Sequence, residues 1–113
     1  MITNIIKKVF YDKDNYVATR DAYGDAIVEL GKRNKDIVVL DADLSKATKT
    51  CKFASRFPER FFNFGIAEQN MMSIAAGLAT MGKIPFVSTF GVFATKRACD
   101  QLSICIAYVY IYY

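Results

Sequence analysis

Apolar runs and amphipathic stretches alternate along this chain of 113 residues. In residues 19–34 the apolar positions recur at helical spacing behind Thr19, a candidate N-cap, and this pattern predicts an amphipathic helix. Residues 36–43, DIVVLDAD, form a short continuous apolar run rich in branched side chains, which predicts a strand buried on both faces. The predicted helix would bury one stripe, made of Ala22, Tyr23, Ala26, Ile27 and Leu30.

The alternation continues through the rest of the chain, where residues 66–81 predict a helix that carries Glu68 in its leading turn. The other predicted elements are a short helix in 49–60 that stops near Pro58, a brief strand in 60–65, a strand in 83–90 with Pro85 at its start, and a helix in 93–107 with Ala94, Ala98, Leu102 and Cys105 on one stripe. Helices that alternate with strands in this way predict an α/β fold, an open doubly wound parallel sheet.

The two ends of the chain fall outside this pattern. Residues 1–17 suggest a loosely attached leader, residues 18–107 the α/β domain, and residues 108–113 an aberrant tail. The tail is rich in Tyr, Val and Ile, which favour a strand, yet nothing follows that could cover it. We therefore expect an incomplete sheet and a truncated chain.

Composition excludes several classes of function. The chain is 53% hydrophobic, so it can build a core, and its net charge of +4 comes from scattered basic residues that favour a solvated surface over a nucleic-acid or membrane partner. Three cysteines without metal-ligand spacing and the absence of histidine exclude a His-based triad or zinc site within the chain. No secretory signal or apolar stretch of membrane-spanning length is present, so we expect a cytoplasmic protein.

Glu68 is the most conspicuous candidate for chemistry, because it is the only charged residue between Ile66 and Met81. A buried carboxylate without a partner is costly, so such a group is paired, neutralised or functional. The ordinary alternative is a first-turn carboxylate that only complements the helix dipole. Asp43 lies at the carboxyl end of a predicted strand, where α/β sheets bind ligands, but it could equally be a surface turn residue.

The chain resembles the pyrimidine-binding domain of transketolase, and in particular the C-terminal subunit of the split bacterial form. The resemblance covers roughly residues 18–107 and rests on ATRDAYGDAIVELGKRNKDIVVLDADLSKATKT, on the GIAEQ segment that contains Glu68, and on TFGVFAT. It implies a transketolase-type transferase that uses thiamine diphosphate to move two-carbon ketol units between sugar phosphates. It also implies a partner, the N-terminal diphosphate-binding subunit, which would hold the diphosphate and Mg²⁺ or another divalent cation in a homo- or hetero-oligomer.

The resemblance also implies roles for individual residues. Glu68 corresponds to the glutamate that hydrogen-bonds the cofactor's aminopyrimidine ring and activates it by proton exchange. Phe90 and Phe93 correspond to an aromatic wall against that ring, Asp43 and Leu44 to a loop near the cofactor, and Arg20 to a contact with the substrate phosphate.

Two rival interpretations stay open at this point. The segments GIAEQ and RACDQL also resemble 1-deoxyxylulose-5-phosphate synthase, although DADLSKATKT and TFGVFAT favour transketolase. Alternatively, the chain is a non-catalytic remnant that only binds a partner subunit, because family members continue well beyond the SICIAY segment.

Overall fold

The computed structural model describes residues 16–108. Most of the expected leader and all of the tail beyond Tyr108 therefore lie outside the described residues. The elements are, in chain order, α2 (Thr19–Arg33), β1 (Ile37–Asp41), α3 (Ser45–Thr48), α4 (Cys51–Arg56), the 3-10 turn η1 (Pro58–Arg60), β2 (Phe61–Asn63), α5 (Glu68–Thr80), β3 (Ile84–Ser88), the π-helical turn η2 (Phe93–Arg97) and α6 (Cys99–Tyr108).

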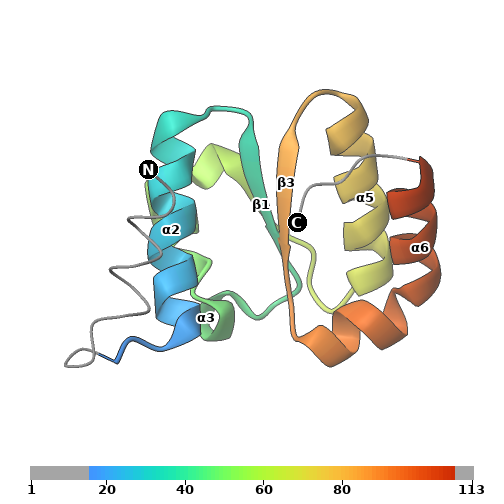
Figure 1. The fold of residues 1–113 in the computed structure, drawn as a ribbon, viewed down its shortest axis with the longest axis horizontal. Coiled ribbons are helices and arrows are strands. Elements are labelled where there is room, and N and C mark those ends of the chain that lie inside the picture. The colour runs from blue at the N-terminus through green and yellow to red at the C-terminus, as the bar shows by residue number, and fades with distance from the viewer. Residues whose placement is uncertain (1–15, 109–113) are drawn as a thin grey trace.

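The strands of the described region form one parallel sheet in the order β2-β1-β3. In the centre of the sheet, Val39 of β1 pairs with Phe61 on one side and with Phe86 on the other. Figure 1 shows the sheet between two helical layers, with α2 on one face and α5 and α6 on the other. This arrangement confirms the predicted doubly wound α/β fold.

Strand β1 is the centre of the core, and every residue in it is buried. Successive side chains point to opposite faces of a strand. Val38 and Leu40 therefore pack with Met71 of α5, while Val39 belongs to a second cluster on the α2 side with Phe53. The sequence prediction of a strand buried on both faces is confirmed.

Helix α2 buries a different stripe from the predicted one. Leu30 is 42% exposed and Ala26 is exposed, whereas Gly24 and Gly31 are buried. The glycines are buried because α4 and the segment before it lie against this helix: a Cβ at Gly31 would lie 2.6 Å from Cε2 of Phe53. The stripe prediction was thus wrong at two positions, because hydrophobicity alone does not identify a glycine that permits close helix packing.

Two helix boundaries also differ from the predictions. The N-cap of α2 is Ala18, with no side-chain hydrogen bond, so Thr19 is the first helical residue rather than the cap. The expected helix over 93–107 consists of the π-helical turn η2 followed by α6, joined at Ala98, which is fully buried. Wider turns of this type frequently occur at functional sites.

A matched pair of helical glycines tests this packing. Gly31→Ala should lower the free energy of unfolding by about 1–3 kcal/mol, because the new methyl group overpacks the rings of Phe53 and Phe57. Gly77→Ala in α5 meets nothing within 4 Å, so it should raise stability by about 0.5–1 kcal/mol. Urea unfolding of both variants measures the difference, and equal effects would contradict the close contact of α2 with α4.

Candidate functional site

The strand order places a crevice at the carboxyl ends of β1 and β3. The chain leaves β1 toward β2 on one side and returns through α5 to β3 on the other side. In open α/β sheets such a reversal of strand order is where ligands bind. The residues that follow Asp41 and Ser88 are therefore the first place to look for a site.

Asp41 ends β1 and is fully buried. Its Oδ1 accepts a hydrogen bond from the backbone N–H of Leu44 at 2.6 Å, and its Oδ2 accepts bonds from the hydroxyls of Thr48 and Thr50 at 2.8 Å each. A buried carboxylate is costly unless it is satisfied in this way. Asp41 therefore fixes the path of residues 42–50, including the short helix α3.

A side-chain amide joins this loop to the segment that leads into α5. Oδ1 of Asn63 accepts hydrogen bonds from the backbone N–H groups of Asp43 and Gly65, both at 3.0 Å. Asp43 and Gly65 both have positive φ angles, of 63° and 68°, which Gly adopts without strain and Asp tolerates better than most residues. The loop with Asp43 and the start of α5 are thus held at the same edge of the sheet.

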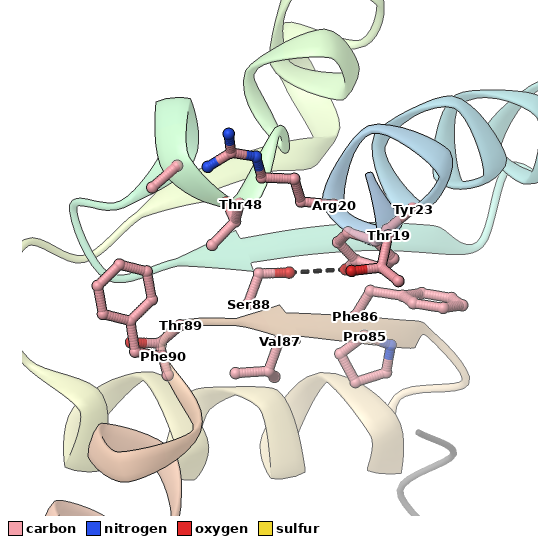
Figure 2. A pocket seen from close by; sticks show the side chains of 11 residues that line it. Thr19, Arg20, Tyr23, Thr48, Pro85, Phe86, Val87, Ser88, Thr89 and Phe90 are labelled. Carbon is pink, nitrogen blue, oxygen red and sulfur yellow. Dashed lines mark hydrogen bonds between the residues drawn. The ribbon is translucent and has the colours of Figure 1, made fainter. Parts of the chain in front are cut away.

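An open pocket lies along β3 and the residues that follow it, with the start of α2 and the end of α3 as its other walls (Figure 2). Arg20 extends from the first turn of α2 toward Thr48, and the ring of Phe90 stands just after β3. Between them the hydroxyl groups of Tyr23 and Ser88 form a hydrogen bond of 2.6 Å. A long cation and an exposed aromatic ring therefore face a mostly apolar pocket, in which Tyr23 and Ser88 satisfy each other while the buried Thr89 hydroxyl has no hydrogen-bond partner among the described residues.

Tyr23 stays neutral in this environment. Burial raises the pKa of its phenol, the hydrogen bond with Ser88 opposes that rise, and the nearby Asp41 charge adds to it. Tyr23 is therefore a hydrogen-bonding group of the pocket floor.

Glu68 lies at the opposite rim of the same edge, as the first residue of α5. Its side chain is only 4% exposed, so the carboxylate is buried as the sequence suggested. Within residues 16–108, the only hydrogen-bond donor to this carboxylate is Nη1 of Arg97, at 3.3 and 3.5 Å from its two oxygens. Both residues line a second pocket with Ile66 and Asn70. Glu68 is thus buried, much less satisfied than Asp41, and placed beside open space.

Aromatic rings connect the two pockets. The rings of Phe90 and Phe93 stack with centroids 5.8 Å apart, and the guanidinium carbon of Arg97 lies 4.1 Å from the centroid of Phe93. Phe93 and Arg97 are the first and last residues of η2, and Arg97 lies between the Phe93 ring and the Glu68 carboxylate. A continuous series of contacts therefore runs from Phe90 at the first pocket to Glu68 at the second.

The structure brings most, but not all, of the candidate residues together. Glu68, Phe93 and Phe90 belong to one series of contacts, and Arg20 shares the first pocket with Phe90. Asp43 and Leu44 do not line either pocket among the described residues; Asp43 is exposed, and the backbone of Leu44 is bonded to Asp41.

Asp41 and Arg97 were not among the predicted site residues. Asp41 could have been identified from the sequence, because it directly follows a continuous apolar run whose strand is buried on both faces. Arg97 was harder to identify from the sequence. It lies opposite Glu68 at the end of the π-helical turn, which regular helical spacing does not predict.

Residues 16–108 contain no cluster of three or more His, Cys, Asp or Glu side chains that could hold a metal ion. In the same range, no helix combines the length and the apolar character needed to cross a membrane.

Comparison with known families gives a match over residues 15–109 to the pyrimidine binding domain of transketolase. The chain is also similar to a solved structure described as a split gene transketolase in an inactive beta4 tetramer. The TM-score is 0.68 and the sequence identity 69%, over 76% of this chain and 29% of that one.

Curated relatives agree with this match. A transketolase C-terminal section from Methanocaldococcus jannaschii is 55% identical over 93 residues, 82% of this chain and 29% of the relative. A 6-deoxy-6-sulfo-D-fructose transketolase subunit from Clostridium sp. is 46% identical over 79% of this chain and 28% of its own length. Human transketolase is 45% identical over 81% of this chain and 15% of its own length. The chain thus spans less than a third of each relative.

The Asp41 network gives a test of how the site is supported. Asp41→Ala should lower the free energy of unfolding by about 2–4 kcal/mol, because it removes three hydrogen bonds at the buried end of β1 and leaves the Leu44 N–H without its acceptor. Asp25→Ala is the matched control, since Asp25 is 69% exposed in its ion pair with Lys52 and should cost less than about 1 kcal/mol. Equal urea midpoints for the two variants would show that the network does not anchor the loop.

Proposed function

This chain belongs to the transketolase pyrimidine-binding domain family, and we propose that it is the pyrimidine-binding part of a thiamine-diphosphate-dependent transketolase. The observation that carries the proposal is the state of Glu68, a buried carboxylate with one weakly held donor, beside a pocket and a pair of stacked rings. A structural carboxylate would be satisfied as fully as Asp41 is.

These residues fit an aminopyrimidine ring. A flat heteroaromatic ring needs an aromatic surface, which Phe90 and Phe93 offer; Phe90 is 45% exposed. A ring nitrogen that must gain and lose a proton needs a carboxyl group within hydrogen-bond reach, which Glu68 offers. Bound thiamine diphosphate would supply the nucleophilic thiazolium carbon that carries the two-carbon ketol unit.

The role of this chain is then to orient the ring and to move one proton. Phe90 and Phe93 fix the plane of the pyrimidine, and Glu68 exchanges a proton with its ring nitrogen. Because Glu68 is buried at the start of α5, little water competes for that hydrogen bond, which strengthens the electrostatic coupling between acid and base.

We infer a partner subunit from the relatives. Their names describe a C-terminal section, a subunit and a split-gene protein, and this chain covers less than a third of each. The partner would hold the diphosphate and its divalent cation, and the complex would be an oligomer in the cytoplasm, consistent with three free cysteines. The named relatives favour transketolase over the synthase alternative.

Arg20 is the proposed contact for the substrate phosphate. It is exposed in the first turn of α2 and extends into the pocket that Phe90 also lines, so a substrate bound next to the cofactor would come within its reach. A guanidinium group binds phosphate oxygens with two parallel hydrogen bonds.

Glu68→Gln tests the proton exchange in the complex reconstituted with the diphosphate-binding partner, thiamine diphosphate and Mg²⁺. The amide keeps the size of the side chain and can hydrogen-bond, but it cannot exchange a proton, so kcat should fall by roughly 10²–10⁴-fold. Exchange of the thiazolium carbon proton with deuterated solvent should slow in parallel. The exposed Glu29→Gln is the control, and a normal exchange rate in folded, cofactor-bound Glu68→Gln would rule the mechanism out.

Arg20→Ala tests the substrate contact. KM for phosphorylated sugars should rise by roughly 10–100-fold, because a charge-assisted hydrogen bond is lost, while cofactor affinity stays the same. Arg33→Ala, at the other end of the same helix and paired with Glu29, should leave KM unchanged. An equal loss with unphosphorylated sugars would show that Arg20 has a structural role instead.

A further inference from the structure

The ion pair between Arg97 and Glu68 is unusually loose for a buried carboxylate. A single nitrogen, Nη1, lies 3.3 and 3.5 Å from the two oxygens, whereas the exposed pair of Lys52 and Asp25 closes to 2.6 Å. Charge-assisted hydrogen bonds in proteins are typically about 2.7–2.9 Å long. Arg97 therefore shields Glu68 without binding it tightly.

The guanidinium group of Arg97 also stacks on an aromatic ring. It lies 4.1 Å from the centroid of Phe93, the ring next to Phe90. A planar group thus lies on Phe93 and directs an N–H toward Glu68. These are the two interactions that a protonated aminopyrimidine ring would make with the same two residues, so the ring and the guanidinium need the same partners.

The side chain of Arg97 can move while its backbone stays in place. The side chain is 48% exposed, against 4% for Glu68, so the guanidinium group can rotate into solvent. Its backbone carbonyl accepts a hydrogen bond of 2.9 Å from Nε2 of Gln69, the residue after Glu68. The end of η2 is thus fixed to α5 independently of the guanidinium.

We propose that Arg97 competes with the aminopyrimidine ring for Glu68 and Phe93, and that its guanidinium group leaves both when the ring binds. The proposal rests on the function proposed above. It makes Arg97 a residue that lowers cofactor affinity and protects the buried carboxylate until the cofactor arrives. A residue that instead positioned Glu68 while the cofactor is bound would raise cofactor affinity. Removal of Arg97 therefore lowers the cofactor Kd if Arg97 competes, and raises it if Arg97 positions Glu68.

Calorimetric titration of thiamine diphosphate into the reconstituted complex with Mg²⁺ measures this sign directly. Arg97→Ala should lower Kd by roughly 3–10-fold, since it removes one long, partly buried ion pair and one cation–π contact that binding must otherwise break. Arg97→Lys keeps the charge but cannot stack as a plane, so it should lower Kd by less than Arg97→Ala.

Two controls separate competition from a general loss of positive charge. Lys35→Ala removes one exposed charge at the amino end of β1, far along the chain from η2, and should leave Kd unchanged. Inorganic pyrophosphate, which lacks the pyrimidine, should bind the wild-type and Arg97→Ala complexes equally.

Each outcome has a distinct meaning. If the wild-type complex binds thiamine diphosphate and Arg97→Ala binds it more weakly or equally, the competition is wrong while the proposed function stands. If the Ala variant does not fold, a Kd of Arg97→Lys at or above that of the wild type overturns the competition. If the wild-type complex does not bind thiamine diphosphate, both the competition and the proposed function fail.

Discussion

The structure depends on how two buried carboxylates at one edge of the sheet are satisfied. Burial of β1 on both faces forces its last side chain, Asp41, into the interior, where three short hydrogen bonds stabilise the charge and define the loop that follows. Glu68, at the start of α5, has only long contacts with Arg97. The same chemical group is therefore fully bonded in one place and only loosely bonded in the other, and the difference is the number and length of its hydrogen bonds.

Fold class and the position of Glu68 could both be predicted, because each depends on local pattern. A continuous branched run predicts a strand such as β1, and a lone carboxylate in an apolar helix stands out without any structure. The roles of Gly24 and Gly31 could not be predicted in the same way, since their burial depends on how closely α4 approaches α2. A hydrophobic pattern identifies the apolar side chains of a helix, whereas the burial of a glycine depends on how closely a neighbouring helix packs against it.

The site could be predicted only in part, because some of its contacts also depend on tertiary packing rather than on local sequence pattern. Phe90, Phe93 and the role of Glu68 were expected through a family resemblance, and the structure places the three residues in one series of contacts through Arg97. Arg97 itself was missed because the π-helical turn shifts the register of the residues that follow it. The role of Asp43 stays a prediction, since its side chain lines neither pocket and its backbone adopts a positive φ of 63°.

The roles proposed for Glu68 and Arg97 explain why a carboxylate would be both buried and weakly hydrogen-bonded. A group that exchanges protons cannot have its lone pairs fully occupied by fixed donors, as those of Asp41 are. It also cannot be left alone in an apolar helix, because an unpaired buried charge destabilises the fold. A half-exposed guanidinium stacked on Phe93 meets both requirements, since it compensates Glu68 loosely and can leave at the cost of little packing. In the proposed function the cofactor ring would replace Arg97 as the hydrogen-bonding partner of Glu68. The contact that stabilises the buried carboxylate without cofactor would thus be the one that is exchanged when cofactor binds.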